Sequence, residues 1–350
     1  MKKTILVFGG AGFIGTNICT LALNKGYKVI AFDSLIRTGV ETNILEHENY
    51  TLIRGDVRNE EDFLRIPTDD LFGIINLAAN PGVPWSVTNP IYDFNANAKG
   101  ALNILEFSRK NGKIPVIQAS TNKVYSEEIN EIKLEERKTR YVVSDKKYYK
   151  GIPENFPVDG IGKFGHSPYG CSKLSADMYC QEYYHIFGVP TVLNRMSCIY
   201  GKYQHGVADQ GWVTWFIIAK ILEQPLEIFG DGKQVRDALY GEDLAELYIH
   251  ELENIELHKG KVYNIGGGPK NTTSLLELID LLDNTKINGG PTYAPLQLTF
   301  KDWRPCDHKV YISDIDKISP YWKPKTPFAT GIMKTYEWVE KNIDMIKGSI

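Results

Sequence analysis

TILVFGGAGFIG (residues 4–15) joins an apolar run to a turn that is rich in glycine. The run at 4–8 predicts a buried strand, and the residues from Phe13 onward predict a helix that ends near Lys25. Glycines let the backbone pass close to phosphate groups, and the free N–H groups and the dipole at a helix N-terminus attract negative charge. We therefore expect a pyrophosphate site made by Gly9, Gly12, Phe13, Ile14 and Gly15.

The second predicted strand ends at a residue with a carboxylate side chain. The apolar run at 28–32 ends in Asp33, at the spacing expected for the acidic residue of a dinucleotide site. Asp33 can accept hydrogen bonds from both ribose hydroxyls, and it would repel a 2′-phosphate. The cofactor predicted from this residue is NAD rather than NADP.

The order of short apolar runs and amphipathic stretches predicts the fold class. Strands are expected at 4–8, 28–33, 50–54, 72–77, 114–119 and 190–195, and helices at 13–25, 90–111 and 168–187, with shorter ones near 40–46 and 59–65. Alternating strands and helices imply a parallel sheet with helices on both faces, and ligands then lie at the carboxyl ends of the strands. We expect an α/β protein with a Rossmann-type doubly wound parallel sheet and a smaller C-terminal α/β domain.

The pattern changes after about residue 196, where the elements become shorter and glycine turns more frequent. We expect a dinucleotide-binding domain at 1–195, with a return excursion to its sheet near 236–265, and a substrate-binding domain at 196–350. Residues 126–165 form an unusual insertion, in which crowded charges precede a half that is rich in glycine and proline. A solvated surface insertion and a lid over the site both fit this segment.

The composition argues against several classes of function. A formal net charge of −3 among 350 residues disfavours nucleic-acid and anionic-membrane partners. The 5 cysteines show no CxxC spacing, which indicates reduced thiols of a cytoplasmic protein and neither a disulfide framework nor a metal site. The apolar run at 4–8 is too short for a signal peptide, and no stretch approaches the roughly 20 apolar residues that span a bilayer. A soluble cytoplasmic protein is expected.

Tyr169 and Lys173 are the predicted centre of the chemistry. They lie four residues apart at the start of the helix expected at 168–187, so the phenol and the ammonium share one helix face. A neighbouring cation, here Lys173 helped by the positive nicotinamide, favours phenolate and brings a phenol toward the range of a useful base at neutral pH. Tyr169 is therefore the predicted base.

Polar residues near the end of the fifth predicted strand complete this site. Thr121 is placed to hydrogen-bond the same substrate oxygen as the phenol. Ser120 either helps Thr121 to hold that oxygen or satisfies backbone groups at the end of the strand. Lys123 is either a functional cation or a solvated loop lysine. Asn97 is a poor interior residue for the helix expected at 90–111. It satisfies backbone groups of a neighbouring strand, holds a water, or is a surface amide.

These features resemble the extended short-chain dehydrogenases/reductases that act on nucleotide-activated sugars, and the resemblance covers essentially the whole chain. Its motifs are GGxGFIG at 9–15, Asp33, Asp56-Val57, LAA at 77–79, Asn97, STNKVY at 120–125, YxxxK at 169–173, Arg195 with Tyr200-Gly201, VRD at 235–237, NIGGG at 264–268 and RPCD at 304–307. The resemblance implies an NAD-dependent isomerase with a nucleotide-diphosphate sugar as its substrate. It also implies a homodimer or homotetramer that pairs through the helices at 90–111 and 168–187.

The same resemblance assigns residues to the two ligands. To the cofactor it assigns Gly9, Gly12, Phe13, Ile14, Gly15, Asp33, Asp56, Val57, Leu77, Ala78, Ala79, Asn97, Ser120, Tyr169 and Lys173, with Asp56 and Val57 flanking the adenine. To the substrate it assigns Thr121, Asn122, Lys123, Cys198, Gln210, Gly211, Trp212, Arg236, Arg304 and Asp307. Arginine suits a diphosphate because its planar guanidinium matches phosphate oxygens.

A few positions narrow the reaction within the family. The 4,6-dehydratases place an Asp–Glu pair after the threonine, whereas this chain has Asn122 and Lys123, so the acid for dehydration is missing. The 4-epimerases usually carry asparagine where this chain has Cys198. The TNK run, HSPYGCSK (166–173), DQGW (209–212) and GKQVRD (232–237) look most like the CDP-tyvelose 2-epimerases, also called CDP-paratose 2-epimerases. The proline-rich stretch 81–86 departs from the family pattern and leaves the sugar preference open.

The expected reaction is inversion of a hexose carbon, C2 by this resemblance, through a transient keto-sugar. Tyr169 would remove the hydroxyl proton, and Thr121 and Tyr169 would hold the ketone while the bound NAD takes up and returns the hydride. One alternative is another activity on the same class of substrate: a 4-epimerase, dehydratase, dehydrogenase, reductase or decarboxylase. Another is a non-catalytic dinucleotide-sensing protein, which would typically lack Tyr169 or Lys173.

Overall fold

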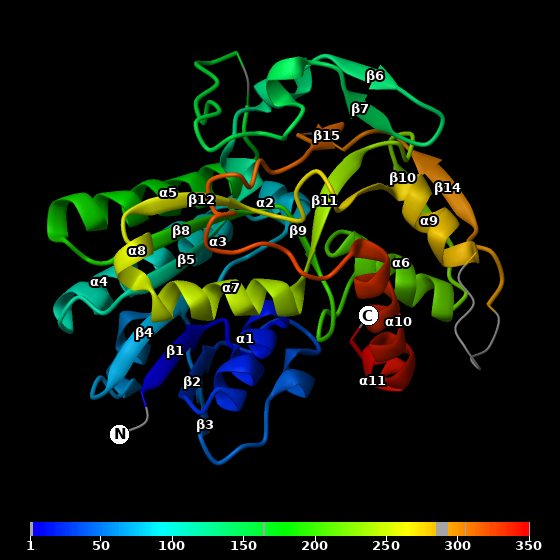
Figure 1. Cartoon of the computed structure of the whole chain (residues 1–350). Coiled ribbons are helices and arrows are strands. Elements are labelled where there is room, and N and C mark those ends of the chain that lie inside the picture. The colour runs from blue at the N-terminus through cyan, green and yellow to red at the C-terminus, as the bar shows by residue number, and fades with distance from the viewer. Residues whose placement is uncertain (1–2, 164, 285–292, 305, 350) are drawn as a thin grey trace. The chain divides into compact units, whose positions relative to one another are not determined.

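The chain forms two compact units, whose elements are labelled in Figure 1. The computed structural model describes residues 3–163, 165–284, 293–304 and 306–349. Unit 1 contains Met1–Val124, His166–Met196 and Gly241–Tyr263, and unit 2 contains Tyr125–Gly165, Ser197–Tyr240 and Asn264–Ile350.

A seven-stranded sheet forms the centre of unit 1, in the order β12-β8-β5-β4-β1-β2-β3 (Figure 1). Its strands are β1 (Thr4–Phe8), β2 (Lys28–Asp33), β3 (Tyr50–Arg54), β4 (Leu71–Asn76), β5 (Val116–Thr121), β8 (Thr191–Met196) and β12 (Lys261–Ile265). The six strands from β8 to β3 pair in parallel. The predicted parallel α/β sheet is confirmed, and each of the six predicted strands lies within two residues of its expected bounds. The seventh strand, β12, was not assigned from the sequence.

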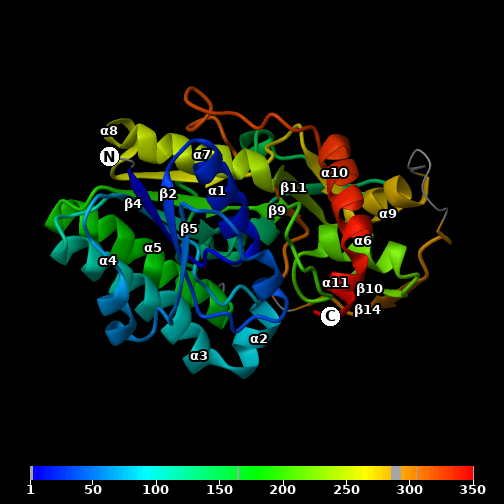
Figure 2. The same ribbon diagram turned by 90° about the horizontal axis from the view of Figure 1, so that it is seen from below.

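Helices cover both faces of this sheet, as Figure 2 shows. α1 (Phe13–Asn24) and α7 (Gly241–Glu253) pack together on one face, and α4 (Gly100–Lys110) and α5 (Pro168–Phe187) pack together on the other. Because both faces are covered, β1 is an unbroken apolar run in which Ile5, Leu6, Val7 and Phe8 are 0% exposed. Of the helices in the described residues, none has the length and apolar character needed to cross a membrane.

The helix predicted at 90–111 is interrupted. It begins as α3 (Pro90–Phe94), widens into a π-helical turn at Asn95–Lys99 and continues as α4. The expectation of one continuous helix is wrong here, because π-helical turns are rare single turns inside α-helices that helix propensity does not distinguish. The short helices predicted near 40–46 and 59–65 are 3₁₀ turns at Val40–Asn43 and Glu60–Arg65.

Unit 2 is built from shorter elements. One sheet contains β9 (Cys198–Tyr200), β11 (Val235–Tyr240), β13 (Thr272–Ser274) and β15 (Val310–Tyr311), and β10 (Leu226–Phe229) pairs in parallel with β14 (Leu298–Lys301). Its helices include α6 (Trp212–Ile221), α9 (Leu275–Asn284), α10 (Phe328–Lys341) and α11 (Ile343–Lys347). The apolar core of unit 2 includes Tyr200, Ile217, Tyr240 and Ile332, each at most 1% exposed.

The insertion expected at 126–165 packs within unit 2. Its hairpin pairs β6 (Leu134–Glu136) with β7 (Tyr141–Val143). The buried Tyr141 packs with Val235 and Val310, and its N–H donates to the carbonyl oxygen of Lys233 at 3.0 Å. From the sequence, this segment is expected in the first domain. It belongs to unit 2 instead, because these contacts tie it to β11 and β15.

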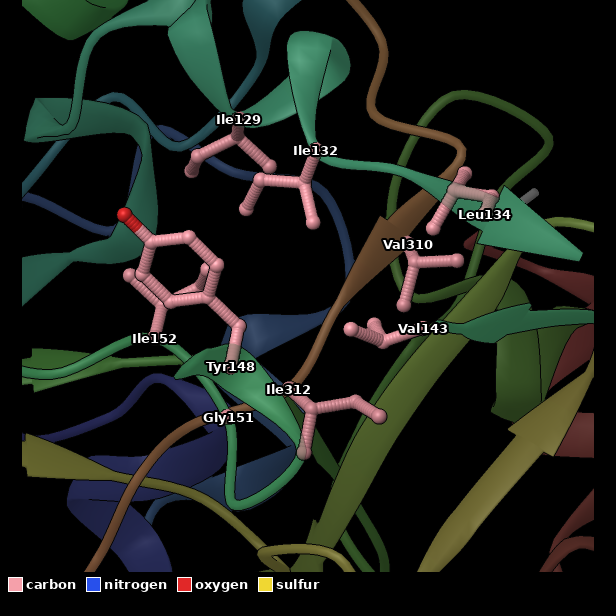
Figure 3. Close-up of a pocket in the computed structure, with 9 residues that line it drawn as sticks. All are labelled: Ile129, Ile132, Leu134, Val143, Tyr148, Gly151, Ile152, Val310 and Ile312. Atoms are coloured by element: carbon pink, nitrogen blue, oxygen red, sulfur yellow. The ribbon is translucent and has the colours of Figure 1, made fainter. Parts of the chain in front are cut away.

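A small apolar cavity lies under the same segment (Figure 3). It is lined by Ile129, Ile132, Leu134, Val143, Tyr148, Gly151, Ile152, Val310 and Ile312. Its volume of about 10 Å³ is roughly the room of one water molecule, and the Tyr148 hydroxyl points away from it. We interpret it as a packing void of unit 2, since it is too small and too apolar for a nucleotide or a sugar.

Candidate active site

A glycine turn connects β1 to α1. The N–H of Gly9 donates to the carbonyl oxygen of Phe32 at 2.8 Å, and the φ of Gly9 is +76°, a region that side chains disfavour. A Cβ on Gly9 would lie 2.9 Å from the backbone nitrogen of Ala78. A Cβ on Gly15 would lie 2.2 Å from the carbonyl oxygen of Gly9. Both positions therefore need glycine.

The N-terminus of α1 is open to an anion. Its N-cap residue is Gly12, and among the described residues no side chain caps the first turn. The first N–H groups of a helix have no intrahelical acceptor, and the positive end of the helix dipole lies at the same place. The five predicted pyrophosphate residues, Gly9, Gly12, Phe13, Ile14 and Gly15, are thus brought together where β1 ends, in a cradle that fits a diphosphate.

Asp33 ends β2 beside this turn. Its Oδ2 accepts a hydrogen bond from the N–H of Ala11 at 3.1 Å, and its Oδ1 accepts one from the N–H of Leu35 at 2.9 Å. Burial raises the pKa of Asp33, and hydrogen bonds from neighbouring backbone N–H groups counteract part of that rise. The two bonds fix the orientation of the carboxylate.

The LAA segment borders the glycine turn on its other side. The N–H of Leu77 donates to the carbonyl oxygen of Phe8 at 2.9 Å, and the N–H of Ala78 donates to Oδ1 of Asn76 at 3.1 Å. Leu77 and Ala78 therefore lie beside the end of β1 and the glycine turn, and Ala79 follows them in the chain.

Asp56 and Val57, the residues predicted to flank an adenine, follow β3. The Asp56 carboxylate accepts hydrogen bonds from the Arg58 guanidinium, at 2.9 Å from Nε and 2.5 Å from Nη2. Burial alone would raise the pKa of Asp56, but the hydrogen bonds and the charge of Arg58 lower it below its ordinary value. The guanidinium also lies over the Tyr92 ring, 4.3 Å from its centroid. Arg58 is not among the site residues predicted from the sequence. Its guanidinium thus occupies the Asp56 carboxylate, which is predicted to flank the adenine.

Tyr169 and Lys173 lie in the first turns of α5. Ser167 caps this helix, because its Oγ accepts a hydrogen bond from the N–H of Gly170 at 3.1 Å. Tyr169 is 9% exposed and Lys173 is 4% exposed. The Nζ of Lys173 donates to the carbonyl oxygen of Ala119 in β5 at 2.8 Å. The helix cap and β5 therefore hold both functional groups in place.

Burial dominates the protonation of this pair. It raises the pKa of Tyr169 to about 12, with the hydrogen bond of Thr121 acting in the opposite direction and the charge of Asp93 adding to the rise. Burial lowers the pKa of Lys173 to about 8, although the carboxylates of Asp177 and Asp93 favour its charged form. From the sequence, Lys173 and the positive nicotinamide of a bound cofactor are expected to bring the phenol toward neutral pH. Burial acts against this in the protein's own groups, and the effect of the two positive charges stays a prediction.

Thr121 ends β5, and its hydroxyl acts on the Tyr169 phenol, where it lowers the pKa. Its hydroxyl donates to Oδ1 of Asn122 at 3.3 Å and accepts from the N–H of Lys123 at 3.2 Å. Ser120 points to a different partner, since its Oγ donates to Oδ2 of Asp177 at 2.8 Å. Thr121 is therefore the strand-end hydroxyl that the structure brings to the phenol.

Asn97 lies in the π-helical turn and is 2% exposed. Its Oδ1 accepts from the N–H of Asn80 at 2.7 Å, and its Nδ2 lies 3.1 Å from the carbonyl oxygen of Asn80. The same Nδ2 lies 3.1 Å from Oδ1 of Asp93 and 3.0 Å from Oγ of Ser172. The surface-amide interpretation is wrong, because Asn97 satisfies the backbone of the segment after β4 and links it to α5.

The predicted substrate arginines of unit 2 are held by carboxylates. Nη2 of Arg236 donates to Oδ1 of Asp307 at 2.6 Å, and Nη2 of Arg304 donates to Oδ1 of Asp209 at 2.6 Å. The Arg304 guanidinium lies 3.8 Å from the centroid of the Phe229 ring. Arg304 and Asp307 thus have different ion-pair partners, and Pro305 of their motif lies outside the described residues.

The remaining substrate candidates lie at β9 and at the start of α6. Burial raises the pKa of the Cys198 thiol to about 12, against the effects of Arg236 and of the Trp212 hydrogen bond. Gly211 is the N-cap of α6 and has a φ of +75°, and the N–H of Gln210 donates to the carbonyl oxygen of Val207 at 3.0 Å. A thiol with so high a pKa is a neutral contact rather than a nucleophile. In the part of the chain that the structure describes, no group of three or more His, Cys, Asp or Glu side chains is placed to hold a metal ion.

Comparison with known proteins finds relatives along the whole chain. The model of the NAD dependent epimerase/dehydratase family matches residues 5–266, a range that contains every residue assigned to the cofactor. The chain is 38% identical over 351 residues to the CDP-paratose 2-epimerase of Salmonella typhi, covering 95% of this chain and 98% of that protein. It is 30% identical over 362 residues to a dTDP-glucose 4,6-dehydratase of Escherichia coli, covering 98% of this chain and 94% of that protein.

A solved structure agrees in fold. The crystal structure of UDP-glucuronic acid 4-epimerase from Bacillus cereus, in complex with UDP-glucuronic acid and NAD, superposes with a TM-score of 0.76 at 28% identity. The match covers 97% of this chain and 99% of that one. The smaller C-terminal domain expected from the sequence is therefore part of the shared architecture.

Proposed function

The chain belongs to the NAD dependent epimerase/dehydratase family, and on this premise we propose that it inverts C2 of the hexose in a nucleotide-diphosphate sugar of the CDP-paratose/CDP-tyvelose type. It is an enzyme of this family of nucleotide-sugar epimerases and dehydratases, and its cofactor is NAD. One observation carries the epimerase over the dehydratase: an amide and an ammonium, Asn122 and Lys123, follow Thr121, where a dehydratase needs its acid. The choice of C2 is supported by the 38% identity to a 2-epimerase. It is also supported by Cys198, which stands where the 4-epimerases usually carry asparagine.

The described residues fit NAD. The turn at the start of α1 needs glycine, because a Cβ on Gly9 or Gly15 would clash with the backbone of Ala78 or Gly9, and Asp33 is held in one orientation beside this turn. We assign the pyrophosphate to the glycine turn, the adenosine ribose to Asp33, and the adenine to Asp56 and Val57. When bound, NAD supplies a hydride acceptor that can also return the hydride, so an epimerisation needs no external oxidant.

Tyr169 is the proposed acid and base. It removes the proton of the hydroxyl on the carbon to be inverted, and it gives a proton back when that carbon is reduced from its other face. The Thr121 hydroxyl, already bonded to the phenol, holds the same oxygen throughout. Because burial raises the pKa of Tyr169 to about 12, the phenolate depends on positive charge at the site, and we assign that role to Lys173 and to the nicotinamide of bound NAD.

Arg236 and Arg304 are the proposed contacts of the substrate diphosphate. Each guanidinium is oriented by a carboxylate at 2.6 Å and keeps further N–H groups for phosphate oxygens. We assign the substrate ribose to Asp307, and further substrate contacts to Cys198, Gln210, Gly211 and Trp212 on the resemblance. A remote anchor of this kind lets the hexose turn while the nucleotide stays bound.

We also propose that the protein is a cytoplasmic homodimer or homotetramer that pairs through α4 and α5. The support is an apolar surface on α5, where Met178 is 48%, Tyr179 46% and Ile186 68% exposed. Light scattering tests this assembly: we expect at least twice the chain mass of 39.6 kDa for the wild type, and a mass of one chain would contradict it. Ile186→Asp should shift the mass toward the monomer, whereas Leu64→Asp, at an exposed site in unit 1, should leave it unchanged.

The proposed function is tested by NMR of the purified protein with CDP-, UDP- and GDP-hexoses in D₂O, without added cofactor. We expect a C2 epimer without solvent deuterium on the ring carbons, formed from the CDP-sugar. Inversion at C4 would contradict the choice of carbon. A deoxy-keto product, or solvent deuterium on a ring carbon, would contradict the epimerase and favour the dehydratase.

A further inference from the structure

Asp93 is a carboxylate of α3 that is 0% exposed and lies beside the Tyr169 site. Its Oδ1 accepts hydrogen bonds from Nδ2 of Asn80 at 2.7 Å and from Nδ2 of Asn97 at 3.1 Å. Its Oδ2 accepts one from Oγ of Ser172 at 2.5 Å. These donors are two amides and a hydroxyl, all neutral. A carboxylate without water needs such donors, because an unpaired buried charge is strongly unfavourable.

The partners of Asp93 belong to three separate segments of unit 1. Asn80 follows β4, Asn97 is in the π-helical turn, and Ser172 is in α5. Asn97 closes the network by bonding both the backbone of Asn80 and Oγ of Ser172. Ser172 directly precedes Lys173, and its Oγ lies 3.0 Å from the carbonyl oxygen of Tyr169. Movement of Asp93 would therefore disturb the turn of α5 that carries both functional side chains.

Asp93 also differs electrostatically from the other buried carboxylate near this turn. Asp177 is paired with Arg195 at 2.9 Å, so its charge is largely offset. Other titratable or charged groups on elements that pack against α5 are Tyr92 of α3, Lys99 of the π-helical turn, Glu106, Arg109 and Lys110 of α4, and Lys123. The groups that act on the Lys173 ammonium are Asp177 and Asp93, and Asp93 acts on the Tyr169 phenol as well.

We propose that Asp93 is a positioning residue of the active site, which fixes the turn of α5 that carries Tyr169 and Lys173 and places a negative charge near the Lys173 ammonium. The π-helical turn serves this role, because it turns Asn97 toward Asp93 and Ser172. The inference rests on the proposed roles of Tyr169 and Lys173, and it holds for either C2 or C4 as the reacting carbon.

Asp93→Asn and Asp93→Ala test this role, with kcat and KM measured against pH on whichever nucleotide sugar the wild type converts. Asp93→Asn keeps the shape and removes the charge, and we expect kcat to fall roughly 10- to 100-fold with KM little changed. The charge of Asp93 opposes the phenolate and favours the ammonium, so its loss lowers both pKa values. The acidic and the basic limb of the plot of kcat against pH should therefore both move to lower pH, by roughly one unit. Glu251→Gln, which removes a buried carboxyl from α7, is the matched control and should leave both limbs in place.

Two results would overturn the inference. One is a kcat within twofold of the wild type in both Asp93 variants. The other is a lower kcat with unmoved limbs and a lower melting temperature, which would make Asp93 a purely structural residue. Tyr169→Phe, measured in parallel, separates this inference from the proposed function. If Tyr169→Phe is inactive while Asp93→Asn behaves like the wild type, the inference on Asp93 alone fails. If Tyr169→Phe stays active, the proposed base fails, and the role of Asp93 fails with it.

Discussion

Tyr169 and Lys173 are the proposed centre of the chemistry, and both are buried. Their pKa values move apart, because burial disfavours the charged form of each: the pKa of Tyr169 rises to about 12 and that of Lys173 falls to about 8. A buried phenol next to an ammonium of such low pKa responds strongly to any further charge at the site. We therefore expect the pair to act as a base once bound NAD adds positive charge to the site.

Removal of the Tyr169 hydroxyl should abolish most of the activity. We expect Tyr169→Phe to lower kcat roughly 10²- to 10⁴-fold, because it removes the proposed acid and base while the ring still fills its place. Binding of NAD, measured by calorimetry, should change little, since the glycine turn and Asp33 are untouched. Tyr179→Phe, an exposed tyrosine of the same helix, is the matched control. Near-normal turnover of Tyr169→Phe would remove this residue from the mechanism.

At the scale of residues, sequence patterns identify what is local. The glycine turn, Asp33 and the Tyr169–Lys173 spacing are readable because backbone conformation and helix periodicity follow from neighbours along the chain. Asp93, Ser172 and Arg58 are not readable in this way. Asp93 and Ser172 meet although 79 positions separate them, and this contact exists only once the sheet has formed.

The contact between α7 and β8 contains a buried acid. Glu251 is 0% exposed, and its Oε2 accepts a hydrogen bond from Nδ2 of Asn194 at 2.7 Å. Burial raises the pKa of Glu251 to about 8, and the hydrogen bond of Asn194 reduces that rise. The folded protein thus favours the neutral form. The stabilisation from this group is complete below the unfolded pKa near 4.5 and is lost as pH rises to about 8.

Glu251→Gln should remove this pH dependence. We expect the free energy of unfolding of the variant to increase relative to that of the wild type as pH rises. The increase is up to about 1.4 kcal/mol per pH unit between the unfolded pKa near 4.5 and the folded pKa of about 8. Urea unfolding at a series of pH values measures the difference. Glu253→Gln on the same helix is the control, because Lys25 and Tyr27 outweigh its burial and lower the pKa of Glu253. A constant difference between Glu251→Gln and the wild type would contradict a neutral Glu251.

At the scale of elements, the interrupted helix shows where periodicity fails. The stretch 90–111 keeps a helical spacing of apolar residues, yet it contains a π-helical turn at Asn95–Lys99. Polar residues in that turn are stabilised by partners on other elements, such as Asn97 with Asn80 and Ser172. Local propensity therefore predicts the helix but not its interruption.

For the whole molecule, the alternation of strands and helices was sufficient to predict the parallel sheet. A parallel sheet covered on both faces uses long buried runs, and such runs are easily recognised in a sequence. The elements of unit 2 are short, and strands such as β15 (Val310–Tyr311) have only two residues. Their pairing with β11 depends on contacts far along the chain, so the sequence predicted a second part without its topology.

The central claim is that the hydrogen removed from the inverted carbon returns to the same carbon. The most direct test is conversion in H₂O of the nucleotide sugar that the enzyme accepts, deuterated at C2, with the products followed by NMR. We predict that the epimer forms with deuterium still at C2, because proton transfer by Tyr169 involves the hydroxyl and not the carbon. Loss of the deuterium to water would contradict the account. So would inversion at a different carbon while C2 keeps both its label and its configuration.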